Sequence, residues 1–191
     1  MKTDKLEKLK KECIKISKEP IVFGEGNPDA SIVLVGEAPG AKEIELKRPF
    51  VGQAGKNLEE FLEVLELKRE DIYITNVVKI RPYKINEKTG RKSNRAPNQE
   101  EIKKYEKYLF EEINIIKPKV IVTLGNVPLK SILKDKKATI GSKHGTVIEM
   151  DKFFVFPLYH PASIIYRREL KNIYLEDLYK LKNFKERIEE D

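Results

Sequence analysis

Residues 31–40 have the sequence SIVLVGEAPG, a short run of aliphatic and β-branched residues that ends in a turn containing two glycines and a proline. A run of this length between turn residues predicts a buried strand followed by a sharp turn. Three similar runs lie at residues 72–74, 120–124 and 153–156. We therefore expect four buried strands.

Helical patterns lie around and between these strands. Apolar residues recur at helical spacing in residues 5–18, 58–65, 102–116 and 172–188. The third segment opens with Asn98 and Glu101, spaced as a capping box. Strands that alternate with helices predict an α/β fold. We expect a three-layer α/β/α sandwich around a central, mostly parallel four-stranded sheet, in a single domain over residues 1–191.

The composition excludes several classes of protein. The chain has 191 residues, 40% of them hydrophobic and 36% charged, and a net charge of +7. No apolar run approaches the ~20 residues that span a membrane, and the charged N-terminus does not resemble a signal peptide. We therefore expect a cytoplasmic monomer that does not contact membranes. The single cysteine, Cys13, excludes an internal disulfide framework and a four-cysteine metal site within one chain.

Residues 79–95 form a strongly basic stretch, with seven lysines and arginines and one acid, Glu87. Pro82 and Gly90 lie within it, so we expect a loop. Taken alone, this stretch is equally consistent with a solvated loop and with an arm that contacts phosphates.

Unusual turns follow all four strands, at residues 36–55, 75–82, 125–126 and 160–163. In an open parallel sheet, ligands bind beyond the carboxyl ends of the strands, where such loops meet. Glycine and proline at a strand end let the backbone turn sharply and approach a ligand closely. The pattern predicts a binding site at this edge of the sheet.

These turns carry a resemblance. The ordered motifs GEAPG, RPFVGQAG, TNVVKIRP and HPAS are similar to those of the uracil-DNA glycosylase superfamily, specifically the family 4 enzymes of bacteria and archaea. Residues 22–28 and 94–97 match as well, so the resemblance covers about residues 22–167. It implies a DNA repair glycosylase that hydrolyses the N-glycosidic bond of deoxyuridine in DNA, with uracil-containing DNA as its partner.

An enzyme that acts on a base must take it out of the stack and recognise its Watson–Crick edge. The side chain of Asn76 offers one acceptor and one donor, which match N3–H and O4 of uracil. Cytosine presents the reverse pattern, which would leave two buried groups unpaired. The resemblance implies that Phe50 stacks on the flipped base and that Gly36, Glu37 and Ala38 line its pocket.

Glycosidic cleavage leaves negative charge on the departing base, largely at O2. The resemblance assigns His160 to stabilise that charge by donating a hydrogen bond. It makes residues 161–167 a wedge that enters the duplex, with Ser163 and Arg167 at the DNA and Ile164 or Ile165 as the plug. From the basic stretch we expect three further DNA contacts, namely Lys79, Arg81 and Arg95.

The motifs alone do not identify the residue that activates water. The best-known branch of the superfamily has an aspartate where this chain has Ala38. Family 4 enzymes instead keep two glutamates, which correspond to Glu37 and Glu43. Either glutamate could orient water or stabilise cationic character on the sugar. We favour Glu43 for orienting water and Glu37 for shaping the pocket.

The resemblance also implies a cofactor, because family 4 enzymes hold a [4Fe–4S] cluster on four cysteines. The corresponding positions here are Lys10, Cys13, Ile80 and Tyr105, so three of the four ligands are absent. The sequence therefore predicts no iron–sulfur cluster and no metal ligands. It also predicts that Cys13, Ile80 and Tyr105 pack together. The chain is longer than expected for the family between Pro82 and Asn94.

Two other functions stay open at this point. The same fold with another deaminated base, such as hypoxanthine or xanthine, is one alternative. A DNA-binding relative without catalytic activity is the other, although the intact pocket motifs argue against it.

Overall fold

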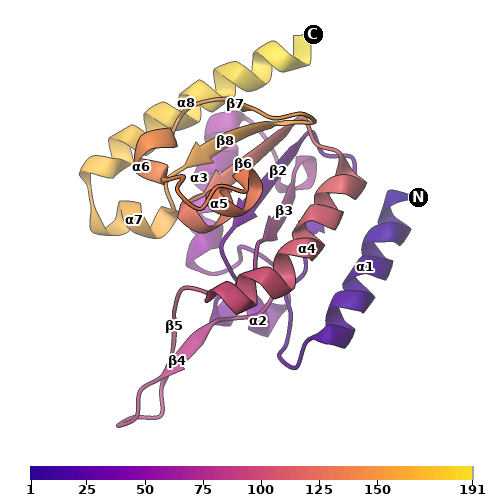
Figure 1. The fold of residues 1–191 in the computed structure, drawn as a ribbon. Helices are drawn as coiled ribbons and strands as arrows, with labels where there is room; N and C mark the ends of the chain where they lie inside the picture. The colour runs from indigo at the N-terminus through magenta and orange to yellow at the C-terminus, as the bar shows by residue number, and fades with distance from the viewer. Residues whose placement is uncertain (191) are drawn as a thin grey trace.

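The computed structural model describes residues 1–190, which are arranged around one central sheet (Figure 1). Its strands lie in the order β1, β3, β2, β6, β8, β7. The four inner strands are parallel, whereas the two edge strands pair antiparallel with their neighbours. The strand bounds are β1 Glu25–Gly26, β2 Ile32–Gly36, β3 Tyr73–Asn76, β6 Val120–Leu124, β7 Ile148–Glu149 and β8 Phe154–Leu158.

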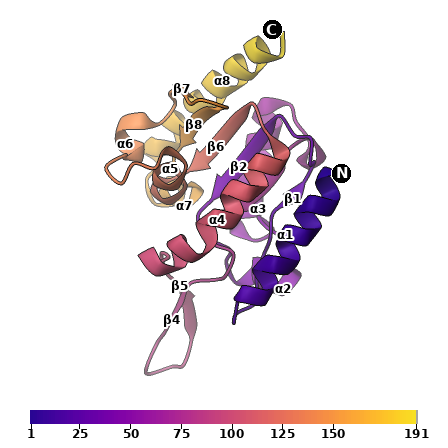
Figure 2. The ribbon, with the colours of Figure 1, turned by 45° about the vertical axis from the view of Figure 1, so that its right-hand side comes forward.

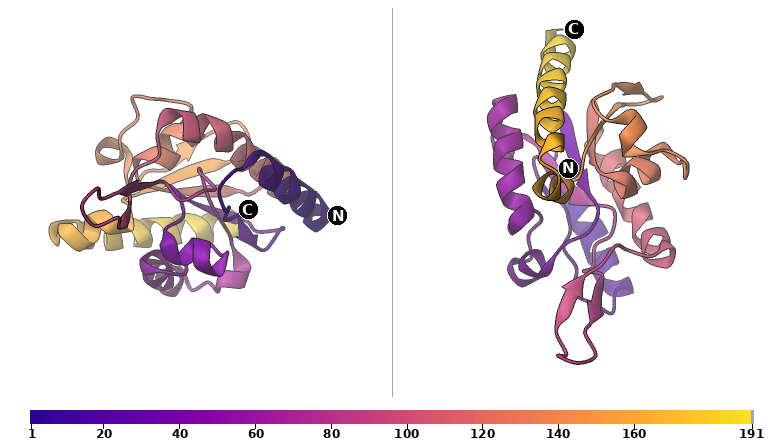
Figure 3. Two further views of the ribbon diagram at one scale, coloured as in Figure 1. Left: turned by 90° about the horizontal axis from the view of Figure 1, so that it is seen from below. Right: turned by 90° about the vertical axis from the view of Figure 1, so that its left-hand side faces the viewer.

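Helices cover both faces of this sheet, as the views along its edges show (Figure 3). On one face, α1 and α4 pack over β2 and β3 around Cys13, Leu109 and Val35. On the other face, α3 and α8 pack around Phe61, Phe156 and Leu178. The helix bounds are α1 Lys2–Ile16, α2 Ala41–Leu46, α3 Gln53–Leu65, η1 Arg69–Asp71, α4 Gln99–Ile116, α5 Asn126–Leu133, α6 Ile140–Lys143, α7 Pro161–Tyr166 and α8 Glu169–Glu190.

This arrangement confirms the predicted α/β sandwich and corrects two of its details. The sheet has six strands rather than four, because a two-residue strand adds to each edge. The basic stretch is not an irregular loop: it contains a hairpin of β4 (Tyr83–Ile85) and β5 (Lys92–Asn94), which projects from the body of the molecule (Figure 2). The predicted capping box of α4 is present, with Asn98 accepting from the backbone of Glu101.

The carboxyl ends of the parallel strands meet at one edge of the sheet. Gly36 at the end of β2 is in register with Asn76 at the end of β3, and Leu124 of β6 is in register with Leu158 of β8. The loops that follow these strands therefore converge, as predicted for a ligand site.

Within residues 1–190, no helix is both long enough and apolar enough to cross a membrane.

Candidate active site

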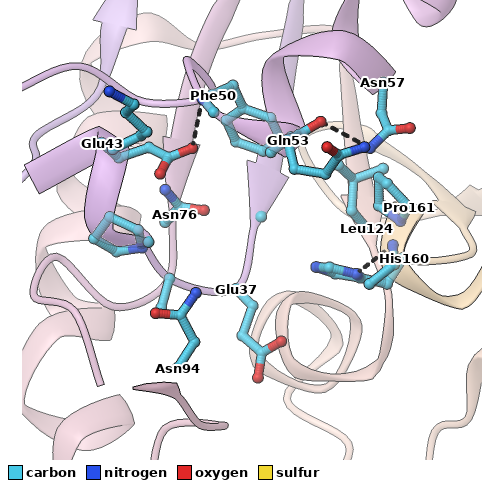
Figure 4. Close-up of a pocket in the computed structure, with 18 of the residues that line it drawn as sticks. Glu37, Glu43, Phe50, Gln53, Asn57, Asn76, Asn94, Leu124, His160 and Pro161 are labelled. Carbon is cyan, nitrogen blue, oxygen red and sulfur yellow. Dashed lines mark hydrogen bonds between the residues drawn. The ribbon is translucent and has the colours of Figure 1, made fainter. Parts of the chain in front are cut away.

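A pocket of about 400 Å³ opens where these loops converge (Figure 4). This volume lies within the range of small-ligand pockets. The structure brings together in its lining all the residues predicted to contact or react with the base: Gly36, Glu37, Ala38, Glu43, Phe50, Asn76 and His160.

Asn76 and Phe50 face the pocket across Gly36. A Cβ atom on Gly36 would lie 2.4 Å from Asn76 Oδ1 and 2.7 Å from Phe50 Cζ. Both separations are shorter than van der Waals contact, so only glycine allows this approach. Among the described residues, the side-chain amide of Asn76 makes no hydrogen bond, although the residue is only 4% exposed. Its donor and acceptor are therefore free for a ligand.

Replacing Gly36 with alanine should lower activity through this contact. The added methyl group must push Asn76 or Phe50 out of place, and a displacement of about 1 Å can cost ~10²-fold in rate. Single-turnover kinetics on a uracil-containing oligonucleotide measures the effect. Gly141→Ala is the matched control, because its Cβ would meet nothing within 4 Å. Equal rates for the two variants would contradict this role for Gly36.

The backbone of Phe50 has an uncommon conformation that hydrogen bonds from Arg69 hold. Its φ is 52°, in the left-handed region. Arg69 donates to the carbonyl oxygen of Phe50 at 3.0 Å and also to that of Pro49. Glu25 pairs with Arg69 at 2.9 Å and with Arg48 at 2.8 Å. Burial favours a higher pKa for Glu25, but the hydrogen bonds from the two arginines outweigh it and hold the pKa below its ordinary value. Arg69 could not be assigned from the sequence, because no motif includes it.

His160 precedes α7 and presents one defined ring nitrogen to the pocket. Its Nδ1 accepts a hydrogen bond from the backbone N–H of Ala162 at 3.0 Å. Burial lowers the pKa of His160 below its ordinary value of 6.5, which favours the neutral ring. Because Nδ1 is an acceptor, the proton of the neutral ring is on Nε2. Gly125, with φ 83°, makes room for this ring, since a Cβ there would lie 3.0 Å from His160 Cβ.

The two glutamates lie in different surroundings. Glu43 is buried, and its Oε1 accepts from the backbone N–H of Gly52 at 3.2 Å. Its carboxylate lies beside Phe50 and Asn76, whereas that of Glu37 points away from Phe50 (Figure 4). Burial raises the pKa of Glu37. Glu43 is thus a fixed carboxylate close to the base-contacting residues.

Helix α7 forms one rim of the pocket. Its packing shows which of the two isoleucines, Ile164 or Ile165, is placed to enter the duplex. Ile164 packs against the core between α3 and α8. Ile165 is 53% exposed and lines the pocket. Ile164 is therefore turned inward, and Ile165 fits the wedge. Ser163 is half-buried in the same helix, and Arg167 directly after it is exposed.

The prediction that Lys79 contacts DNA is wrong. Lys79 is fully buried, and its Nζ donates to Glu112 at 2.5 Å, to Thr75 Oγ1 at 2.6 Å and to the carbonyl oxygen of Asn76 at 2.9 Å. An ammonium group held in this way cannot reach a phosphate outside the molecule.

The other two predicted phosphate contacts lie at the base of the β4–β5 hairpin. Arg81 donates to Asn94 Oδ1 at 2.7 Å, and Arg95 pairs with Glu101 at 2.7 Å. Asn94 also lines the pocket, together with Gln53 and Asn57. These three amide side chains were not predicted from the sequence, although they lie within or just after the motifs.

Curated proteins with similar sequences are named type-4 uracil-DNA glycosylases. The relative from Sulfurisphaera tokodaii is 39% identical, and the match covers 94% of this chain and 84% of that protein. The relative from Thermotoga maritima is 41% identical over 88% of this chain and 85% of its own length. The relative from Archaeoglobus fulgidus is 42% identical, and the match covers 86% of this chain and 82% of that protein.

These relatives contradict the prediction that the protein has no cofactor, because type-4 uracil-DNA glycosylases are iron–sulfur proteins. The prediction that the cofactor is absent is therefore withdrawn. The loss of ligand residues does not by itself establish that a cofactor is absent.

The side chains at the corresponding place do not fit such a cluster. As predicted, Cys13 and Tyr105 lie in one hydrophobic cluster, with Ile80 packed against it. A [4Fe–4S] cluster needs four thiolates, whereas burial raises the pKa of the one thiol here, Cys13, to about 11. Within residues 1–190, no three His, Cys, Asp or Glu side chains are grouped to hold a metal ion.

The family model of the uracil DNA glycosylase superfamily matches residues 23–182. This range contains the pocket and all four parallel strands. The relatives are similar over most of their own lengths, so the likeness extends over the whole fold and beyond the pocket motifs. This chain belongs to the uracil-DNA glycosylase superfamily.

Proposed function

We propose that this protein is a DNA repair glycosylase that hydrolyses the N-glycosidic bond of deoxyuridine in DNA, releasing uracil and leaving an abasic site. The observation that carries the proposal is the free side-chain amide of Asn76, which faces the same pocket as Phe50 and His160. The names of the relatives support the same activity.

Selection of the base follows from Asn76. Its Oδ1 accepts from uracil N3–H and its Nδ2 donates to O4, while Phe50 stacks on the ring. A cytosine in the same position would leave two buried polar groups unpaired, at a cost of about 1–3 kcal/mol each. Cytosine in undamaged DNA is thereby disfavoured as a substrate.

Departure of the base is assisted by His160. As the bond between C1′ and N1 breaks, its electron pair goes to the base and negative charge gathers at O2. The Nε2–H group of neutral His160 donates a hydrogen bond to that oxygen. The ring needs no reorganisation, because the bond from Ala162 already fixes its orientation.

Water completes the reaction on the sugar. The water oxygen forms a bond with C1′, and a carboxylate orients the water and takes up its proton. We assign this role to Glu43, whose carboxylate the backbone of Gly52 holds close to the bound base. Glu37 shapes the opposite wall of the pocket.

The pH dependence should follow from His160. When the ring is protonated, Nδ1 gains a proton and loses the hydrogen bond from Ala162, so the rate falls as pH drops through the pKa of His160. Since burial lowers that pKa, the acid limb of the single-turnover rate should have a midpoint below 6.5. His160→Gln should be slower and should lack this limb. A midpoint above 6.5 that disappears in the variant would contradict the assignment.

A panel of oligonucleotides tests the proposal, with uracil, hypoxanthine, xanthine or cytosine at one position in single- and double-stranded form. Alkali cleaves the strand at an abasic site, so cleavage should appear with uracil. Cleavage with hypoxanthine or xanthine alone would favour the second substrate class, although Asn76 is matched to uracil. If no substrate is cleaved, the proposed activity is wrong, and a DNA-binding protein without catalytic activity is the remaining alternative.

The monomeric state and the cytoplasmic location stay predictions. Size-exclusion chromatography with light scattering should give the mass of one chain, and a mass of two chains would contradict the monomer.

A further inference from the structure

We propose that the β4–β5 hairpin, residues 83–94, binds the phosphate backbone of duplex DNA several nucleotides away from the flipped base. The inference rests on the proposed function and extends it, since it assigns the hairpin a part of the substrate that the pocket does not touch. The hairpin projects from the molecule (Figures 2 and 3), and Asn94 at its base lines the pocket.

The charge of the hairpin suits a polyanion. Four cationic side chains are exposed along it, and Glu87 is its only acid. Within residues 1–190, none of the four forms an ion pair; Lys92 instead lies over the ring of Tyr83, 4.3 Å from its centroid. The four cations are Lys84, Lys88, Arg91 and Lys92.

The hairpin is ordered by its own backbone. Its strands pair from Tyr83 with Asn94 to Ile85 with Lys92. Asn86 closes the turn, because its Oδ1 accepts from the backbone of Lys88 at 2.9 Å and of Thr89 at 3.1 Å. A preformed element loses little entropy on binding, so its charges contribute more to affinity than those of a flexible loop.

The base of the hairpin is fixed beside the pocket. Arg95 donates to the carbonyl oxygen of Tyr83 at 3.0 Å and to both carboxylate oxygens of Glu101 at the start of α4. Arg81 is bonded to Asn94, and Asn94 lines the pocket. The hairpin therefore keeps a constant direction relative to a base held in the pocket.

The length of the hairpin sets its reach along DNA. A strand advances roughly 3.3 Å per residue, so about five residues from its base to its tip extend ~15 Å. Phosphates of one strand are spaced roughly 3.4 Å along the helix axis. The cations near the tip should thus lie at phosphates about four to five nucleotides from the flipped base.

The test replaces all four cations with glutamine and measures binding to a duplex that carries a stable abasic-site analogue, at several salt concentrations. Each phosphate contact contributes about 0.9 to the slope of log affinity against log salt. The slope should therefore fall by about 2–4. The control replaces Lys5, Lys8, Lys11 and Lys15, which are exposed on α1, and should keep the original slope.

Duplex length gives a second readout. Shortening one flank of the DNA to fewer than about five base pairs should weaken binding of the original protein but not of the glutamine variant. An unchanged slope and the same length dependence in both proteins would overturn the proposal. Uracil release by the original protein is measured in parallel. If no uracil is released but the salt slope falls in the glutamine variant, the proposed function alone is refuted. If uracil is released but the slope is unchanged, phosphate binding by the hairpin alone is refuted.

Discussion

Replacing Asn76 with alanine should lower the single-turnover rate of uracil release by about 10²–10³-fold. The variant loses two hydrogen bonds to the base inside a buried pocket, each with a cost of about 1–3 kcal/mol, and ~1.4 kcal/mol corresponds to a factor of ten in rate. The same change should leave the fold intact, because the amide of Asn76 makes no hydrogen bond to the described residues.

Asn114→Ala is the matched control for this prediction, since Asn114 is exposed on α4, away from the pocket. The control should release uracil at the rate of the original protein. Thermal unfolding of both variants shows whether a lower rate reflects chemistry or loss of structure. An Asn76→Ala variant that is as active as the control would refute the proposed recognition of the base.

Replacing Lys79 with methionine should destabilise the protein by about 3–5 kcal/mol. Lys79 and Glu112 are both fully buried and paired, so removing the ammonium group leaves an unpaired carboxylate in the interior. Glu112 also accepts from Tyr73, Thr75 and the backbone of Gly24. The free energy of unfolding, measured by urea denaturation, gives the size of the effect.

The double variant Lys79→Met/Glu112→Gln separates charge from packing. Glutamine keeps an acceptor for the neighbouring donors but carries no charge, so the double variant should be more stable than Lys79→Met alone. Lys42→Met is the control, because Lys42 and its partner Glu45 are both more than 60% exposed, and it should cost less than about 1 kcal/mol. A Lys79→Met variant no less stable than this control would contradict the buried pair.

The sequence predicted the inner part of the fold because burial leaves a pattern. The strand at residues 120–124 matches β6 residue for residue, and the cap at Asn98 begins α4. The edge strands were missed since two residues, such as Glu25–Gly26, carry no periodicity. The hairpin was missed because its strands have only three residues each and are mostly exposed, so they carry no clear periodic pattern.

The pocket could be predicted because its residues follow strands that end at one edge of the sheet. What the sequence could not give was the direction of individual side chains. Lys79 belongs to a basic stretch, and its buried partner Glu112 is 33 positions further along the chain. Ile164 and Ile165 are adjacent and chemically identical, and only the packing of α7 distinguishes the half-buried Ile164 from the exposed Ile165.

Direct detection of the released base tests the central claim most simply. The protein is incubated with a duplex containing one uracil, and the free base and the intact abasic strand are quantified by mass spectrometry before any alkali is added. We expect one free uracil for each abasic site, and no cytosine from the matched cytosine duplex. An intact uracil duplex after incubation with correctly folded protein would contradict this expectation.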